Sequence, residues 1–380
     1  MEPLTGFILN ELKNLVVVVN PQGKIKYVNK YTHDLLGIST STTNLFEYRH
    51  SIEKAKTITT EIVEEYQINK TKSASGFEKP LLTYSGHTLW IMWNVTQDQD
   101  GNMIGIGYDI TEKKTAELQL KEKALMLEER QNDVISSIQY AQRIQEALLP
   151  DLEKLKKYFS GVMGLYKPRD FVSGDFYWIT KKENYLFIAV GDCTGHGVPG
   201  AMMSVMGNSL LNNVIKKHGV LTCDEILREL DRELHLCLNH KSYGTRDGMD
   251  LSLLRIDVNT MYAQYCGAMR GALLLRNQEI HEIKASKYPL GFYDDVPKYF
   301  ENINWQMQKG DKFYMFTDGY CHQFGGDNNK KFNKKNFKEL LLSLNDMPMS
   351  DQEHYLDYVF QNWKQKNPQT DDVTVVGISI

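Results

Sequence analysis

The chain has 380 residues, of which 42% are hydrophobic and 24% are charged, and its formal net charge is −4. These values are ordinary for a globular protein and leave room for two or three domains. The slightly acidic balance argues against a general nucleic-acid-binding or anionic-membrane surface. Apolar runs such as Leu15–Val19 are too short to span a membrane, and the first residues lack a signal-peptide pattern. A cytoplasmic protein is therefore expected.

Five cysteines without regular spacing predict reduced thiols and no structural zinc site.

Residues 1–111 alternate short predicted strands with helices. Four runs predict two hairpins: LVVVVN (15–20) with IKYVNK (25–30), and TLWIMWNVTQ (88–97) with MIGIGYDI (103–110). A helical stretch is expected around 31–70, with a polar turn at 70–76. This order, together with PQGKIKYVN, DQDGN and DITE, resembles a PAS domain. The resemblance implies a sensor module whose ligand the sequence does not identify, although the absence of cysteine before residue 193 excludes a cysteinyl-flavin photosensor.

One long helix is expected over residues 112–150. The segment 112–149 lacks glycine and proline, and Pro150 supplies a stop. Asp109 and Glu112 have the spacing of a capping box. Apolar residues recur every seven positions: Leu120, Leu127, Val134, Ala141 and Leu148. This ladder favours a parallel coiled-coil homodimer built on a signalling helix. Gln131 and Gln145 share the seam and predict a weak or switchable coil. The alternative is a helix that packs on its own domains.

Residues 151–380 alternate strands and helices too irregularly for a repeated parallel β-α-β unit. Strands are expected at 161–167, 175–181, 184–191, 249–258, 262–268, 271–276, 280–285, 312–317 and 373–380. Helices are expected at 200–218, 222–239, 334–344 and 351–366. Many strands with few helices, grouped rather than alternating, indicate an α+β domain with stacked sheets.

Four aspartates of this region lie where a predicted strand meets a loop. Asp192 and Asp318 follow apolar runs, whereas Asp175 and Asp371 precede them. In an antiparallel sheet the end of one strand lies beside the start of its neighbour, so all four carboxylates can converge on one rim. Clustered carboxylates repel one another and resist ionisation unless cations neutralise them. An all-oxygen cluster suits the hard ions Mg²⁺ and Mn²⁺.

Other functional interpretations of these loops are excluded by the spacing of their motif residues. Residues 195–200 fit G-x-G-x-x-G, but the helix that follows leads to another helix rather than to a strand with a ribose-binding acid. The sequence around TDG (317–319) lacks the second aspartate of an aspartyl-phosphate enzyme. The chain has no P-loop motif and no nucleophile elbow.

Five segments together resemble the SpoIIE/RsbU branch of the metal-dependent protein phosphatases (PPM, protein phosphatase 2C). They are SGDFYW (173–178), GDCTGHGVPGAMMS (191–204), DGMDLSLLRID (247–257), TDGY with QFGG (317–326) and TDDVTVVGISI (370–380). The similarity covers about 155–380, and SSIQYAQRIQEALLP (136–150) resembles the helix that leads into such domains. The resemblance implies an α/β-β/α sandwich and a serine/threonine phosphatase over residues 151–380.

The resemblance also implies a binuclear Mn²⁺/Mg²⁺ site. Asp192 is expected to bridge both ions, with the backbone carbonyl of Cys193 as a further ligand. Asp318 and Asp371 are expected to hold one ion, and Asp175 to contribute directly or through water. Two such cations activate a water that attacks the phosphoryl group in line, without a covalent enzyme intermediate.

Further residues carry open alternatives. His196 either protonates the leaving seryl or threonyl oxygen or supports its loop. Arg169 either binds phosphate or forms a surface ion pair. Asp247 and Asp372 are candidates for residues that support the ligands. His322 departs from close relatives, which usually carry an acid between TDGY and QFGG, and this puts any extra ligand or substrate contact from that loop in doubt.

The leading prediction is a dimeric, PAS-regulated phosphoprotein phosphatase whose sensor signal passes through the helix at 112–150. The resemblance suggests a STAS-type anti-anti-sigma protein or a similar signalling protein as substrate, with no nucleic-acid or membrane partner. The alternative is a non-catalytic sensor or scaffold that binds a signalling partner.

Overall fold

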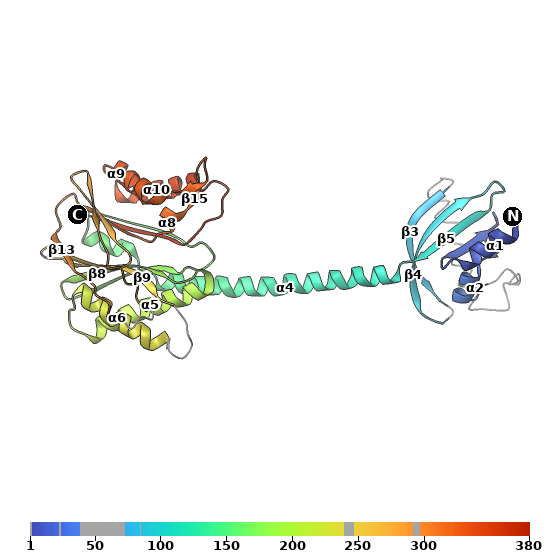
Figure 1. The fold of residues 1–380 in the computed structure, drawn as a ribbon, viewed down its shortest axis with the longest axis horizontal. Helices are drawn as coiled ribbons and strands as arrows, with labels where there is room; N and C mark the ends of the chain where they lie inside the picture. Colours follow the sequence, from blue (N-terminus) through green and yellow to red (C-terminus); the bar gives the residue numbers. More distant parts are fainter. Residues whose placement is uncertain (1, 23, 39–72, 84, 239–246, 292–296) are drawn as a thin grey trace. The chain divides into compact units, whose positions relative to one another are not determined.

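The computed structural model describes the chain except for residues 1, 23, 39–72, 84, 239–246 and 292–296 (Figure 1). The chain divides into two compact units, Met1–Gln131 and Asn132–Ile380. No helix among the described residues is long and apolar enough to cross a membrane.

The first unit contains a five-stranded antiparallel sheet in the order β2-β1-β5-β4-β3. Its elements are α1 (Glu2–Glu11), β1 (Leu15–Val19), β2 (Ile25–Val28), α2 (Lys30–Leu36), β3 (Ser73–Leu82), β4 (Thr88–Gln97) and β5 (Met103–Asp109). Both predicted hairpins are present, β1 with β2 and β4 with β5. Alternate residues of β4, among them Trp93, pack with Leu15 and Val17 of β1 in the core of this unit.

Two local predictions for this unit need comment. The polar turn expected at 70–76 is wrong in its described part, because β3 begins at Ser73 and pairs along its length with β4. The backbone pairing overrides the weak strand preference of Ser73, Ser75 and Gly76. Most of the helical stretch expected at 31–70 lies outside the described residues, and α2 covers only its start.

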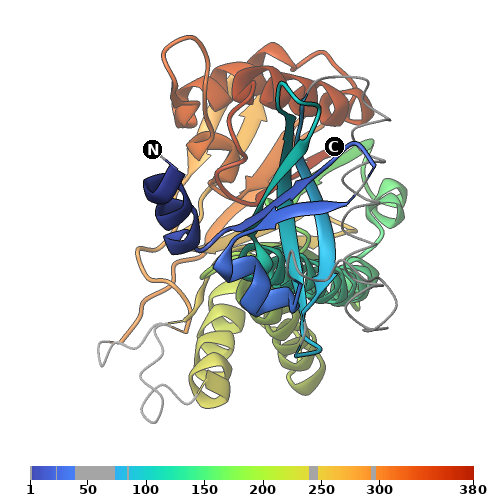
Figure 2. The same cartoon turned by 90° about the vertical axis from the view of Figure 1, so that its right-hand side faces the viewer.

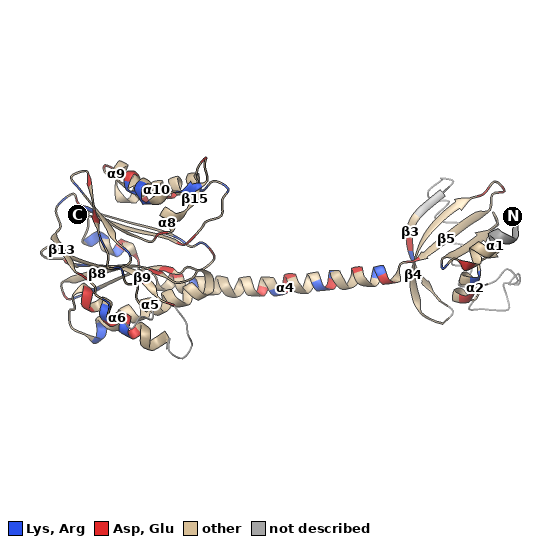
Figure 3. Ribbon diagram, viewed as in Figure 1, with Lys and Arg blue, Asp and Glu red and all other residues tan. Residues whose placement is uncertain are grey.

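Helix α4 (Thr111–Leu148) begins one residue before and ends two residues before the predicted long helix. At its start the Asp109 carboxylate accepts the backbone N–H of Thr111 at 2.9 Å. Acidic and basic residues are interspersed along α4 (Figure 3). Leu120, Leu127 and Val134 of the predicted seam are exposed. Gln145, on the same seam, is instead 6% exposed, because it contacts the second unit to which the end of α4 belongs.

The second unit stacks two five-stranded sheets, one ordered β13-β10-β9-β8-β7 and the other β12-β11-β14-β17-β6. Their strands are β6 (Gly161–Lys167), β7 (Asp175–Lys182), β8 (Tyr185–Cys193), β9 (Met249–Asp257), β10 (Tyr262–Ala268), β11 (Ala272–Arg276), β12 (Glu279–Ile283), β13 (Ile303–Gln306), β14 (Lys312–Phe316) and β17 (Val373–Ser379). All nine expected strands are present. Within these two sheets β13 was not predicted; it is a short edge strand in which every second residue is exposed.

Helices cover the outer face of each sheet, giving four layers (Figures 1 and 2). Ile188, Leu254 and Phe313 belong to the core between the sheets. A second core joins the first sheet to α5 (Gly197–Lys217) and α6 (Cys223–Leu238). A third joins the second sheet to α8 (Gly319–His322), α9 (Asn333–Ser343) and α10 (Met349–Lys364). Shorter elements are the 3₁₀ helix η1 (Leu152–Lys157), β15 (Phe324–Gly325) and β16 (Lys330–Lys331). The mixed α and β class predicted from the sequence is confirmed.

Candidate active site

Strand register places three carboxylates in a row across the first sheet. Asp175 of β7 is the cross-strand partner of Asp192 of β8, and Asp192 is the partner of Asp250 of β9. Directly opposed residues of antiparallel strands point to the same face. Asp192 shares its face with Ile188 and Val190, which lie in the core between the sheets. The row therefore faces the second sheet at one rim of the sandwich.

The second sheet brings the remaining two predicted aspartates to this rim. Asp318 follows β14 and Asp371 precedes β17, and these two strands are paired. The hydroxyl of Thr317 donates to Oδ2 of Asp175 at 2.6 Å and so links the two sheets. Asp175 itself is only 1% exposed. Four strand ends from two sheets thus converge, as the sequence pattern suggested.

A guanidinium group lies among these carboxylates. Arg270, in the turn between β10 and β11, has Nη2 2.6 Å from Oδ2 of Asp192 and Nη1 2.7 Å from Oδ2 of Asp318. Its Nε lies 3.2 Å from Oδ2 of Asp250, at an angle that makes no hydrogen bond. One fixed positive charge is therefore shared by three carboxylates of both sheets.

The carboxylates are held in a setting that resists ionisation. Burial raises the pKa of Asp175 well above its ordinary value, and repulsion from Asp192 adds to this shift. Burial raises the pKa of Asp192 to about 7, with Arg270 opposing the shift and neighbouring carboxylates, Asp318 first, reinforcing it. The pKa of Asp371 is also raised, mainly by burial. Additional positive charge would favour the ionised form of each group.

These residues fit a hard divalent cation. As the side chains stand, no group of three or more His, Cys, Asp or Glu in the described part of the chain is spaced to hold a metal ion. Arg270 lies between Asp192 and Asp318 and is a stand-in cation there. The donors around it are all carboxylate oxygens, partly buried and mutually repelling, which is the ligand chemistry of Mg²⁺ and Mn²⁺. A metal ion that used the Oδ2 atoms of Asp192 and Asp318 would compete with the guanidinium for them.

The other predicted residues lie around this cluster. Asp372 is structural, because its Oδ1 accepts the backbone N–H of Arg169 and its Oδ2 that of Gly174, both at 2.7 Å. The exposed side chain of Arg169 reaches only the carbonyl of Thr370, at 3.4 Å. Cys193 ends β8, and its N–H donates to the carbonyl of Gly174 at 3.3 Å.

His196 directly precedes α5 and lies half-exposed, with Nδ1 3.3 Å from Oδ2 of Asp170. Asp247 accepts the hydroxyl of Thr194 at 3.2 Å and so supports the loop after β8. His322 is nearer the cluster, with Nδ1 3.5 Å from Oδ2 of Asp318. Neither His196 nor Asp247 contacts the four predicted aspartates directly through a hydrogen bond or ion pair among the described residues.

Close backbone approaches explain the glycines of the site loops. A Cβ at Gly200 would lie 2.3 Å from the carbonyl oxygen of Gly195, and one at Gly319 would lie 1.9 Å from that of Asp372. Gly195 and Gly197 have φ of +82° and +62°, which side chains other than glycine rarely adopt. The glycines therefore let the loops after β8 and β14 pack beside the acidic cluster.

Two members of the cluster were not predicted from the sequence. Asp250 is the second residue of β9, within DGMD, so the strand-end argument used for the other aspartates applies to it as well. Arg270 carried no signal, because it is a single basic residue in a turn between two apolar strands. Only the folded chain shows that this turn lies over the row of carboxylates.

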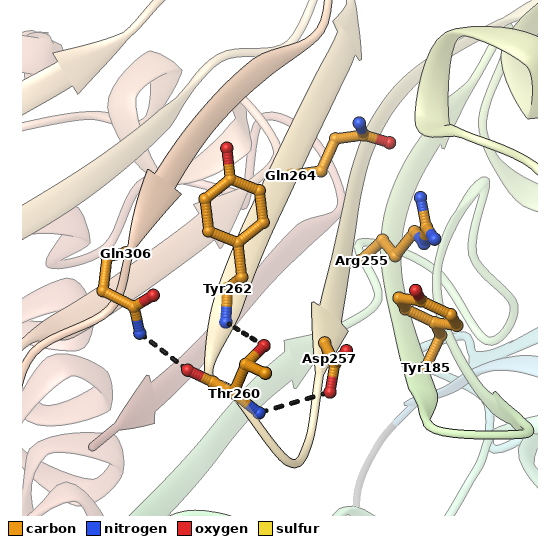
Figure 4. Close-up of a pocket in the computed structure, with 7 residues that line it drawn as sticks. All are labelled: Tyr185, Arg255, Asp257, Thr260, Tyr262, Gln264 and Gln306. Carbon is orange, nitrogen blue, oxygen red and sulfur yellow. Dashed lines mark hydrogen bonds between the residues drawn. The ribbon is translucent and has the colours of Figure 1, made fainter.

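Two cavities differ in their relation to the cluster. One of about 310 Å³ adjoins it and is lined in part by Arg270 and Asp318. The other, of about 490 Å³, is lined in part by Tyr185 and Asp257, at the opposite ends of β8 and β9 from Asp192 (Figure 4). The guanidinium carbon of Arg255 lies 3.8 Å from the centre of the Tyr185 ring there. This second cavity is not part of the acidic site.

Comparison with known proteins agrees with this fold. Residues 182–380, just over half of the chain, match the family Stage II sporulation protein E (SpoIIE). The solved SiaA-PP2C domain of Pseudomonas aeruginosa is 28% identical, with a TM-score of 0.61 over 66% of this chain and 98% of that domain. The PP2C phosphatase domain of SpoIIE from Bacillus subtilis, with a fragment of its regulatory domain, is 19% identical, with a TM-score of 0.47 over 58% and 61%. No curated protein matches the chain.

The fold and site define a metal-dependent serine/threonine phosphatase of the protein phosphatase 2C type. Within that class, the chain belongs to the SpoIIE family. The resemblance stated from the sequence motifs is confirmed for the phosphatase region.

Proposed function

We propose that this chain hydrolyses phosphoserine and phosphothreonine in a phosphoprotein, using two Mn²⁺ or Mg²⁺ ions. The ligands are Asp175, Asp192, Asp318, Asp371 and the backbone carbonyl of Cys193. The observation that carries this proposal is the convergence of strand-end carboxylates from both sheets around one stand-in cation.

The cations, when bound, supply an activated water and stabilise the charge of the phosphoryl group. The protein's own residues keep the ligands in place. Thr317 fixes one carboxylate oxygen of Asp175, and Asp372 ties two site loops together through the backbone N–H groups of Arg169 and Gly174. His196 is the proposed proton donor to the leaving oxygen, for which its half-exposed ring at the start of α5 gives it access to solvent and substrate. Arg169, exposed beside Asp371, is the proposed phosphate contact.

Regulation is part of the proposal. Residues 1–111 act as a PAS sensor, 112–150 as a signalling coiled coil and 151–380 as the phosphatase. The antiparallel sheet ordered β2-β1-β5-β4-β3 and the direct passage from β5 into α4 support the first two assignments. The proposed substrate is a STAS-type anti-anti-sigma protein or a similar signalling protein, as the motif resemblance suggests.

The test is hydrolysis of an aryl phosphate and of a phosphoserine peptide with added Mn²⁺ or Mg²⁺ and with a chelator. We expect turnover only with metal. Asp318→Asn is expected to lower kcat/KM by about 100-fold or more, because a metal ligand is lost where several kcal/mol of charge stabilisation are supplied. Asp346→Asn, which changes an exposed carboxylate between α9 and α10, is the matched control and is expected to keep full turnover. Absence of turnover with every metal in the folded protein would refute the proposal.

A further inference from the structure

The cavity beside the acidic cluster has a basic rim. We call it the basic pocket and define it by Met269, Arg270, Asp318, His322, Lys331 and Lys334, which line its volume of about 310 Å³. Arg270 and Asp318 belong to both the pocket and the acidic cluster. Lys331 and Lys334 are exposed at the rim, and Met269 is 50% exposed. The pocket thus leads from the proposed reaction centre to the surface.

The rim carries more positive charge than its own acids neutralise. Residues 327–338 contain five lysines and one acidic residue, Asp327. Lys331 makes no ion pair among the described residues, and its ammonium lies 5.8 Å from the centre of the Phe324 ring. Lys334 and Lys338 both pair with a single carboxylate, that of Glu282. Two ammonium groups share one negative charge there. The rim therefore keeps a net positive charge both at Lys331 and at the Lys334/Lys338 pair.

His322 adds to this balance. It stands where an acid was expected from the motif resemblance, and it lines the pocket with Nδ1 3.5 Å from Oδ2 of Asp318. An acid at this position would place a negative charge beside the lysines. Histidine instead places no carboxylate at this position. This feature belongs to this chain's own sequence rather than to its motifs.

A volume of about 310 Å³ is small for a binding site and holds a few side chains of an extended segment rather than a folded partner. Lysines at such a rim attract carboxylates, and they repel basic segments. We propose that the basic pocket binds acidic side chains flanking the phosphorylated residue of the substrate, so that this phosphatase prefers phosphosites in acidic sequence. The inference rests on the proposed function and names the substrate class of the same site.

The test compares two phosphoserine peptides that differ only in their flanking residues, acidic in one and uncharged amides in the other. We expect kcat/KM to be about 3- to 10-fold higher for the acidic peptide, mainly through KM, because several exposed charge pairs contribute modestly each. The preference should shrink between about 0.05 M and about 0.5 M salt, because exposed charges are screened. Lys331→Glu combined with Lys334→Glu should abolish or invert it.

The control changes two exposed lysines at the other end of the sheets, Lys181→Glu with Lys309→Glu. It makes the same change of charge and is expected to keep the preference. Equal hydrolysis of the two peptides by the unsubstituted protein, or an undiminished preference in the Lys331/Lys334 variant, would overturn the inference. An aryl phosphate assayed in parallel separates the failures. If the protein hydrolyses the aryl phosphate but shows no preference between the peptides, only this inference is refuted. If it hydrolyses no substrate, the proposed function and this inference are both refuted.

Discussion

Arg270 is the residue on which the electrostatics of the acidic cluster depend in the metal-free protein. Its guanidinium contacts Asp192 and Asp318 from different sheets and is itself half-buried. Removing one partner of such a network leaves charges that burial makes unfavourable. The same guanidinium competes with any cation that needs those oxygens. We therefore expect Arg270 to stabilise the metal-free state and to weaken metal binding.

We expect Arg270→Ala to lower the free energy of unfolding of the metal-free protein by about 3 kcal/mol. The rise in Tm on adding Mn²⁺ or Mg²⁺ should be larger than in the unsubstituted protein, because the metal no longer competes with a guanidinium. Thermal unfolding with and without metal measures both effects.

Arg276→Ala is the matched control for this prediction. Arg276 pairs with the buried Asp311, far along β11 and β14 from the cluster, so its loss should lower Tm without changing the metal-induced rise. A metal-induced rise in Arg270→Ala no larger than in Arg276→Ala would contradict the competition.

At the residue scale, the local sequence pattern predicted the positions of side chains that lie at strand ends. Asp175, Asp192, Asp318 and Asp371 each stand at a strand end, and an antiparallel fold gathers strand ends. Arg270 was missed because nothing in its own turn distinguishes it from a surface residue. The roles of His196 and Arg169 stay predictions, since both side chains are exposed: His196 lies near Asp170, and Arg169 donates to the carbonyl of Thr370.

At the scale of elements, the last turns of α4 are tied to the active-site loop by one amide. Gln145 Nε2 donates to the carbonyl of Ser173 at 2.6 Å and to the hydroxyl of Ser204 on α5 at 2.8 Å. Its Oε1 accepts the N–H of Ser173 at 3.0 Å. Ser173 in turn accepts the N–H of Asp175 through its hydroxyl, also at 3.0 Å. Helix α4, helix α5 and the loop before Asp175 therefore share one buried side chain.

We expect Gln145→Ala to destabilise the phosphatase unit by about 1–3 kcal/mol, because buried backbone groups of Ser173 lose their partners. Turnover should fall, and the metal concentration needed for half-maximal activity should rise, since Asp175 loses its support. Gln142→Ala removes an amide of the same helix that bonds only to Glu146 and should leave both measurements unchanged. If Gln145→Ala lowered stability but left metal activation as it was, its role would be structural alone.

The helices and strands also show which element bounds can be predicted from the local sequence pattern. The bounds of α4 and of the nine expected strands follow from propensity, breakers and apolar runs, which act within a few residues. Strand β3 was misread because Ser73, Ser75 and Gly76 have little strand preference of their own, and it is the neighbouring strand β4 that makes them extended. Edge strand β13 was missed for a similar reason.

At the scale of the molecule, α4 presents an apolar seam that the single chain leaves uncovered. Leu120 is 67% exposed and Leu127 is 66% exposed. The other end of the same seam contains Gln145, which is used within the chain. Packing within the chain thus accounts for the end of α4 that holds Gln145. The proposed dimer contact is confined to the end nearer the first unit.

We expect the full chain to be a dimer by sedimentation equilibrium. Leu120→Lys combined with Leu127→Lys should make it a monomer, because each charge would lie in the apolar seam. Leu118→Lys with Leu125→Lys is the control, since these leucines are similarly exposed, are seven residues apart and lie off the seam. A dimer that survives the first pair of substitutions would place the contact elsewhere, and a monomeric unsubstituted chain would remove the proposed coiled coil.

The sequence by itself determined the α+β class, the extent of α4, nine strands of the phosphatase unit and the four strand-end aspartates, because each of these depends on residues close together in the chain. The tertiary structure decided which groups meet at the site. The register of β7, β8 and β9 set Asp250 beside Asp192, a turn after β10 brought Arg270 over the carboxylates, and the end of α4 turned Gln145 toward Ser173. These contacts depend on pairing between segments that are distant in the sequence, so they cannot be predicted from the local sequence pattern.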